Sequence, residues 1–192
     1  MPRASAADAA RTAHRVLGSA TSLFAARGFA DVSLDDVARS AEVTRGAVYH
    51  HYRNKAALFT AVAARLQAEI AAAVAAAAEN AGPDPSDQLR AGSHAFLDTI
   101  TSGAAVQVLL IDAPAVIGWR EWRRLDEENS EAHLREALHD AGVTDDLLGA
   151  TTAQLSGAMN ELALWVASQD AVEHARARAH TSLDRMLSAY LS

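Results

Sequence analysis

The chain has 192 residues, of which 50% are hydrophobic and 21% are charged, and its formal net charge is −7. This is the composition of a globular chain, and it excludes a disordered or fibrous protein. The sequence holds no cysteine, which excludes a disulfide framework and a thiolate metal site and agrees with a reducing cytoplasm.

The N-terminal segment lacks the apolar core of a secretion signal. The apolar run at residues 70–78 is too short to cross a bilayer, and charged side chains closely precede it. The sequence therefore predicts a cytoplasmic protein with no membrane partner.

Apolar residues at helical spacing and a high alanine content predict an all-α fold of about nine helices, with no strand. The first helix is expected to end at Arg27, because Gly28 follows it and glycine readily takes the left-handed conformation that ends many helices. Ser33 is expected to cap a short second helix, since its hydroxyl can accept from a free backbone N–H group.

A turn at residues 41–44 leads to a predicted third helix from Thr44 to about Tyr49. Asn54 is predicted to cap a much longer fourth helix, which ends in the loop at residues 80–85. A helix of about 25 residues is roughly 38 Å long, so this helix would reach from the N-terminal segment into the rest of the chain.

The remaining helices are predicted around breaks rich in glycine, proline and threonine. Ser86 is expected to cap the fifth helix and Thr144 the eighth, which runs to about Ser168. A single helix is expected between Pro114 and Leu138, and the last helix covers about residues 171–191.

Charge is distributed unevenly along the chain. Residues 1–60 carry eight basic and five acidic side chains, a net +3, whereas the rest carries nine basic and nineteen acidic ones, a net −10. Three short helices in a basic segment fit a helix-turn-helix unit, whose third helix enters the major groove of DNA. Any small helical subdomain would also show short helices with polar outer faces, so this pattern alone leaves both interpretations open.

The third helix is expected to bury one stripe of side chains, Val48 and Tyr52, against the first two helices. The opposite stripe mixes cationic, hydrogen-bonding and small residues, which suits contact with DNA. That stripe consists of Thr44, Arg45, Ala47, Tyr49 and His50.

Four motifs follow one another at 23–29 (LFAARGF), 33–38 (SLDDVA), 41–52 (AEVTRGAVYHHY) and 54–59 (NKAALF). In order and spacing they resemble the N-terminal DNA-binding domain of the TetR family of transcriptional regulators. Glu42 departs from the family pattern, which usually has glycine at this turn. A residue other than glycine can occupy a left-handed turn position at modest cost, so the departure affects the turn and not the resemblance.

The resemblance implies roles for individual residues. Thr44, Tyr49 and Lys55 match positions that contact phosphate, and Arg45 and His50 are the best candidates for reading base edges. Ala47 is suited to a thymine methyl group. Together with the capping residue of the second helix, the predicted DNA-binding set is Ser33, Thr44, Arg45, Ala47, Tyr49, His50 and Lys55.

The resemblance also implies a C-terminal body that forms a homodimer and, in many members, a small-molecule pocket. Small residues in the eighth helix and apolar ones in the ninth fit a four-helix dimer bundle, although a helix pair within one chain would show the same pattern. Asp112 is assigned either to a helix cap or to a ligand contact. The candidate pocket residues are Phe96, Ile100, Leu110, Trp119, Trp122, Gln154, Met159 and Asn160.

Catalytic and metal sites are not predicted. The eight histidines lack the spacing that places metal ligands on one helical face, and no phosphate loop or nucleophile motif occurs. The resulting hypothesis is a DNA-binding domain at residues 1–55 and an effector-binding and dimerisation domain at residues 56–192, with no cofactor. The chain would act as a repressor that a small molecule releases from a palindromic operator on double-stranded DNA. A regulator without an effector and a helical enzyme with a vestigial head remain alternatives.

Overall fold

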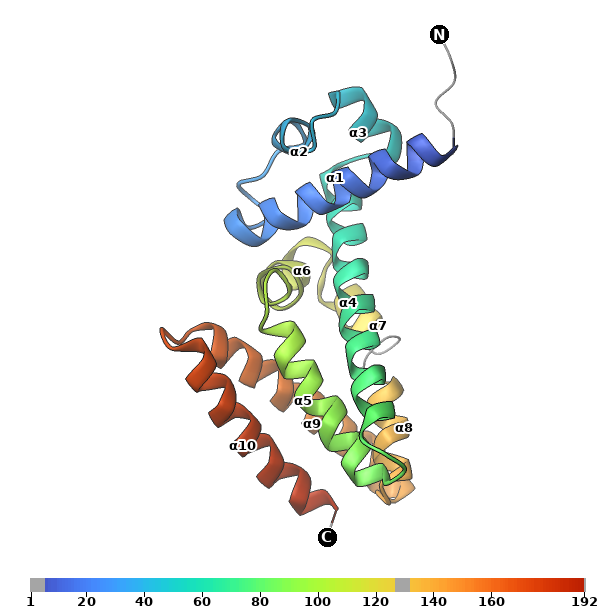
Figure 1. Ribbon diagram of the computed structural model, residues 1–192, viewed down its shortest axis with the longest axis vertical. Coiled ribbons are helices and arrows are strands. Elements are labelled where there is room, and N and C mark those ends of the chain that lie inside the picture. The colour runs from blue at the N-terminus through green and yellow to red at the C-terminus, as the bar shows by residue number, and fades with distance from the viewer. Residues whose placement is uncertain (1–5, 127–131, 192) are drawn as a thin grey trace.

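The computed structural model describes residues 6–126 and 132–191 of the chain. Within these ranges it holds ten α-helices and one π-helix and no strand, which confirms the predicted all-α fold (Figure 1). In chain order the helices are α1 (Ala6–Arg27), α2 (Leu34–Ser40), α3 (Arg45–His51), α4 (Lys55–Asn80), α5 (Pro85–Ile100), η1 (Val106–Asp112), α6 (Ala113–Val116), α7 (Trp119–Asp126), α8 (Ala132–Asp140), α9 (Asp145–Ala167) and α10 (Val172–Tyr190).

Helix α4 connects the two ends of the molecule. Figure 1 shows α1, α2 and α3 gathered at one end, here called the head, and α4 running from them along the body. Helix α5 returns antiparallel beside α4, and α9 and α10 pack against α5. Helix α4 is long and apolar enough to cross a bilayer. One such helix is weak evidence for a membrane span, because core helices of soluble proteins have the same length and hydropathy. Here α4 buries its apolar side chains within the fold, from Leu58 to Ile70.

The short helices of the head begin where local hydrogen bonds predict. The Ser33 hydroxyl accepts from the backbone N–H of Asp36, whose carboxylate accepts in return from the Ser33 backbone N–H, which makes a full capping box. The Asn54 side chain accepts from the backbone N–H of Ala57 at 2.8 Å and so starts α4. The predicted caps of the second and fourth helices are therefore confirmed.

Two left-handed residues shape the turns of the head. Gly28 ends α1 with a φ of +73°, as predicted, and Glu42 lies in the turn between α2 and α3 with a φ of +52°. Glu42 is the only residue other than glycine with a positive φ in the described part of the chain. This turn keeps the left-handed geometry although its residue is not glycine.

Aromatic rings hold the head onto the first turns of α4. The rings of Phe24 and Phe29 each meet Phe59 edge to face, with centroids 5.2 Å apart, and Phe24 and Phe59 are fully buried. Edge-to-face pairs place the positive ring edge against the negative ring face, which adds to the stabilisation from burial. The cluster therefore fixes how α4 leaves the head.

Several predicted helix boundaries are wrong. Helix α5 is capped by Asp84 and not by Ser86: Pro85 begins the helix, and the Asp84 carboxylate accepts from the backbone N–H groups of Ser86 and Asp87. Proline needs no hydrogen-bond partner for its nitrogen, so it suits the first helical position. Thr144 precedes α9 as predicted, but its hydroxyl donates to the Asp146 carboxylate and makes no cap.

The predicted single helix between Pro114 and Leu138 is interrupted at Gly118. The chain forms α6, α7 and α8 in this region, and α6 ends before Gly118, which has a φ of +86°. Residues 127–131, between α7 and α8, lie outside the described residues. Ahead of α6, the apolar run that begins at Val106 forms the π-helix η1.

Candidate nucleic-acid interface

Helices α2 and α3 form a helix-turn-helix on the outer side of α1. Thr44 occupies the N-cap of α3, where its hydroxyl accepts from the backbone N–H of Ala47 at 3.2 Å. Val48 faces inward and is completely buried, whereas Tyr49 remains 43% exposed. Helix α3 is thus anchored along one stripe and free along the other, as the sequence predicts.

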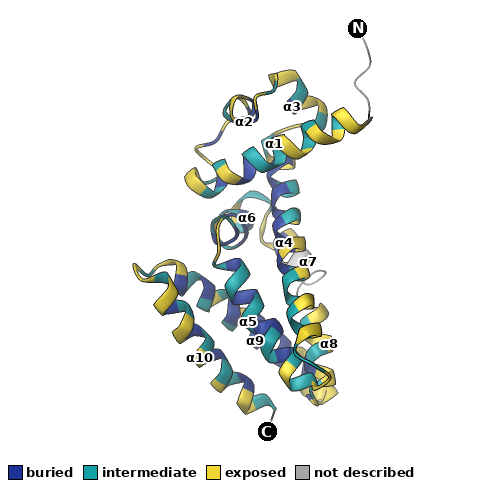
Figure 2. Cartoon of the chain, viewed as in Figure 1, coloured by how far each residue is buried: buried dark blue, intermediate teal, exposed yellow. Residues whose placement is uncertain are grey.

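The predicted DNA-binding residues lie together at the head end of the molecule. Figure 2 shows α2 and α3 with both exposed and buried residues, at the end of the molecule where α4 begins. Most of the set is exposed, and Ala47 and Lys55 are half-buried. The exposed members are Ser33, Thr44, Arg45, Tyr49 and His50.

Arg45 is held in place by two neighbours. Its guanidinium lies 3.2 Å from the Asp35 carboxylate of α2 and donates to the Tyr49 hydroxyl at 3.3 Å. It also lies over the Tyr49 ring, 5.3 Å from the ring centre. The Tyr49 hydrogen bond, followed by the charge of Asp35, raises the pKa of the Arg45 guanidinium above its ordinary value, which keeps the group cationic.

Lys55 is oriented by the loop that follows α1. Its ammonium donates to the carbonyl oxygen of Phe29 at 2.7 Å and to that of Ala30 at 3.2 Å, and lies 4.2 Å from the centre of the Phe29 ring. A lysine ammonium has three N–H donors, so one donor remains for a further acceptor. Lys55 therefore presents a positioned positive charge at the start of α4.

A shallow hollow of about 270 Å³ lies between α2, α3 and the start of α4. It brings together four residues of the predicted set, whereas Thr44, Ala47 and His50 lie outside it. Two cations and several hydrogen-bonding groups face one surface here, which suits an anionic backbone. The lining residues are Ser33, Leu34, Asp35, Arg45, Tyr49, Asn54 and Lys55.

Asp112 joins the body to the head, a role that the sequence does not predict. It lies at the N-cap position of α6 but makes no cap bond there. One carboxylate oxygen accepts from the backbone N–H of Phe29 at 2.8 Å, and the other accepts from the Gln107 amide at 3.2 Å. The same residue, Phe29, therefore has its N–H bound by the body and its carbonyl oxygen bound by Lys55.

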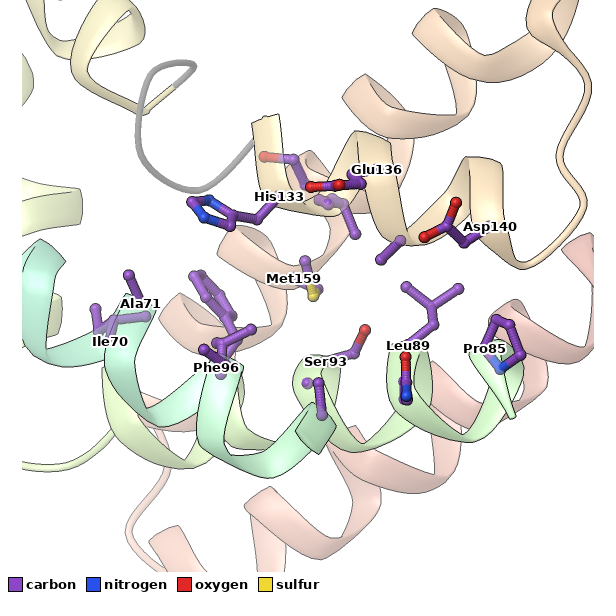
Figure 3. Close-up of a pocket in the computed structure, with 18 of the residues that line it drawn as sticks. Ile70, Ala71, Pro85, Leu89, Ser93, Phe96, His133, Glu136, Asp140 and Met159 are labelled. Carbon is purple, nitrogen blue, oxygen red and sulfur yellow. The ribbon is translucent and has the colours of Figure 1, made fainter. Parts of the chain in front are cut away.

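A second cavity lies in the body, between the distal half of α4 and helices α5, α8 and α9 (Figure 3). Its volume is about 240 Å³, and most of its wall is apolar. Three predicted pocket residues line it, namely Phe96, Met159 and Asn160. The sequence did not point to its remaining polar lining, which comes from Gln88, Ser93, His133, Glu136, Asp140 and Ser156.

The other five predicted pocket residues lie elsewhere. Ile100 belongs to the buried core, and Leu110 packs against it. Trp122 is buried with its indole N–H donating to the carbonyl oxygen of Leu109, whereas Trp119 is 63% exposed. Gln154 is exposed on α9.

Two family models match the chain. Residues 86–190 match the tetracyclin repressor-like C-terminal domain, and residues 16–62 match the bacterial regulatory proteins of the tetR family. The chain belongs to the TetR family. Within this family it is similar to a TetR-family transcriptional regulator from Pectobacterium atrosepticum, with 27% identity and a TM-score of 0.75 over 97% of each chain.

Curated HTH-type transcriptional regulators match part of the chain. The HTH-type transcriptional regulators SrpR and TtgW, both of Pseudomonas putida, are each 45% identical to the chain over 67 residues. These residues make up 35% of this chain, 32% of SrpR and 50% of TtgW. The chain thus spans no more than half the length of these two relatives.

Proposed function

We propose that this TetR-family chain is a transcriptional repressor that binds a palindromic operator as a homodimer and is released by a small molecule. The proposal rests on the surface formed by α3 and the start of α4, where contacts within the protein already hold the side chains in place. Arg45, Tyr49 and Lys55 are held by neighbouring groups at one end of a basic segment. Relatives of the chain are transcriptional regulators, which supports a role in regulation and not in catalysis.

The proposed contacts divide into positioning and reading. Thr44, Tyr49 and Lys55 would bind phosphates, which fixes the register of the head on the duplex. Arg45 and His50 would read base edges in the major groove, and Arg45 has the forked geometry that fits guanine. Ser33 and Ala47 would complete the surface around these groups.

The proposed homodimer uses α9 and α10. The exposed side of α9 carries small residues, Gly149, Ala150, Ala153 and Gly157, over which a second helix can approach closely. Two copies of this helix pair would form a four-helix bundle. The two α3 helices would then enter successive major grooves, about 34–36 Å apart.

Release by a ligand requires a connection between body and head. Helix α4 supplies one, because it begins at Lys55 and its distal half lines the body cavity. The Asp112 contact with Phe29 supplies a second. A ligand that shifts α4 would change the spacing of the two heads, which is a coupling between two sites.

The test is the selection of bound DNA from a random pool, followed by binding measurements on the selected sequence. Tyr49→Ala and Lys55→Ala should each weaken binding by about tenfold or more, since each removes a phosphate contact, while circular dichroism stays unchanged. Arg120→Ala removes an exposed cation from α7 and is the matched control. A dimer that selects no sequence, or an equal loss in the control, would contradict the proposal.

A further inference from the structure

The body cavity contains a buried hydroxyl group with no partner. Ser93 of α5 is only 4% exposed, and its Oγ makes no hydrogen bond within the described part of the chain. Figure 3 shows this hydroxyl pointing into the cavity, toward Met159 on the opposite side. Buried polar groups are nearly always hydrogen-bonded, so an unpaired hydroxyl on a cavity wall is available to a polar atom of a bound molecule.

Most of the cavity wall is apolar. Ile70 and Val74 of α4, Leu89 and Phe96 of α5 and Met159 of α9 line the cavity together with Ser93. A cavity of about 150 Å³ is enough to hold benzene, so the 240 Å³ here suits a substituted aromatic ring. The phenyl ring of Phe96 offers a partner for such a ring.

Two carboxylates and one histidine, His133, line the cavity, and one of the carboxylates, Asp140, also lies 3.4 Å from the His139 ring. Glu136 and Asp140 of α8 lie across the cavity from Ser93, and both are exposed (Figure 3). None of the described residues that line the cavity is a lysine or an arginine. The sequence beyond residue 60 also carries a net charge of −10, so the field of the body adds to the local carboxylates. Such a mouth attracts cations and repels anions.

We infer that the cavity binds a small aromatic amine, with a hydrogen-bonding group at Ser93 and a positive charge near Glu136 and Asp140. The apolar ring would lie between α4, α5 and α9. The proposed binding does not depend on the proposed function. Only the effect of this binding on the DNA-binding end of the molecule rests on the proposed function. Because α4 supplies one wall, a molecule seated here would bear directly on the helix that leads to Lys55.

Four related compounds separate the two polar contacts. Tyramine carries a phenol hydroxyl and an ammonium group. 2-Phenylethylamine lacks the hydroxyl, and 4-ethylphenol lacks the ammonium group. 3-(4-Hydroxyphenyl)propionate keeps the hydroxyl and carries a negative carboxylate in place of the ammonium group. Calorimetric titration of the full-length protein gives the dissociation constant of each compound. Tyramine should bind tightest, and the propionate should bind at least about tenfold more weakly than tyramine at low salt.

Ser93→Ala tests the buried hydroxyl. It should weaken tyramine and 4-ethylphenol by about tenfold, whereas 2-phenylethylamine should change by less than about twofold, because it makes no hydrogen bond there. Ser86→Ala, on the same helix but outside the cavity lining, is the matched control. Equal losses for tyramine and 2-phenylethylamine would overturn the assignment of Ser93. Thermal unfolding of each variant without ligand shows whether the fold is intact.

The double variant Glu136→Gln with Asp140→Asn tests the acidic mouth. The preference for tyramine over the propionate should fall to within about twofold. An unchanged preference, or no binding of any of the four compounds, would refute the inference. Operator binding without any compound is measured on the same samples, so a failure of DNA binding is distinguished from a failure of this site.

Discussion

Asp112→Ala tests the contact between body and head most directly. The substitution removes the acceptor for the Phe29 backbone N–H and frees the Gln107 amide as well. A hydrogen bond to a charged group contributes about 1.5–3 kcal/mol, and this contact is only partly buried, so a loss of about 1–2 kcal/mol is expected. About 1.4 kcal/mol corresponds to a tenfold change in an equilibrium, and amide exchange at Phe29 should accelerate by about this factor.

The assay is hydrogen–deuterium exchange resolved at the Phe29 amide, together with urea unfolding. Asp112→Asn keeps an oxygen acceptor but loses the charge, so its exchange rate should lie between those of the wild type and Asp112→Ala. Asp170→Ala removes an exposed carboxylate between α9 and α10 and is the control. If Phe29 exchanges equally fast in the wild type and in Asp112→Ala, the carboxylate does not hold the head, and the proposed second connection is wrong.

Three further predictions concern the head and the start of α4. Glu42→Gly should raise the free energy of unfolding by up to about 1 kcal/mol in urea titrations, because it relieves a left-handed φ of +52°; a loss of stability would contradict the strain. Ser33→Ala should cost about 0.5–2 kcal/mol in thermal unfolding at neutral pH, and a melting temperature equal to that of the wild type would show that the cap is dispensable. The Ser33 side-chain and backbone hydrogen bonds hold the pKa of the Asp36 carboxyl below its ordinary value, so the wild-type advantage should persist above that ordinary value and decline as the pH falls through the lowered pKa. Phe59→Ala should cost about 3–5 kcal/mol, since it empties the ring cluster with Phe24, and a cost below about 1 kcal/mol would refute that role.

Features that depend on residues close in sequence could be predicted. The capping box of Ser33 and Asp36 and the cap of Asn54 each connect residues three apart, so the sequence alone contains both partners. The left-handed conformation of Gly28 could also be predicted, because the conformational freedom of glycine is a property of that single residue. The wrong cap at Ser86 shows the limit even here: Asp84 and Pro85 together make the stronger start signal.

Features that depend on the packing of distant segments could not be predicted. Asp112 and Phe29 are 83 positions apart, and no sequence pattern connects them. The body cavity exists only because four helices leave space between them, so an aromatic residue such as Trp119 gives no sign that it lies on the surface instead. The position of Ser93 on the cavity wall could not be predicted either, since no sequence pattern distinguishes a helical serine that faces a cavity from one that faces solvent.

Arg45 and Lys55 are both held by neighbouring groups of the protein, but by groups of different kinds. In the proposed complex, Arg45 would exchange the Asp35 carboxylate, which its Nε and Nη1 contact, for a base edge, whereas Lys55 could keep both backbone carbonyls and still donate one N–H group. Under the proposal, a phosphate would therefore gain the Lys55 contact at little cost on any sequence. Under the proposal, Arg45 would change partner favourably only for an acceptor as good as a carboxylate, and the paired O6 and N7 atoms of guanine offer such an acceptor. The exchange at Arg45 would thus separate operator from other DNA, while Lys55 contributes affinity common to both.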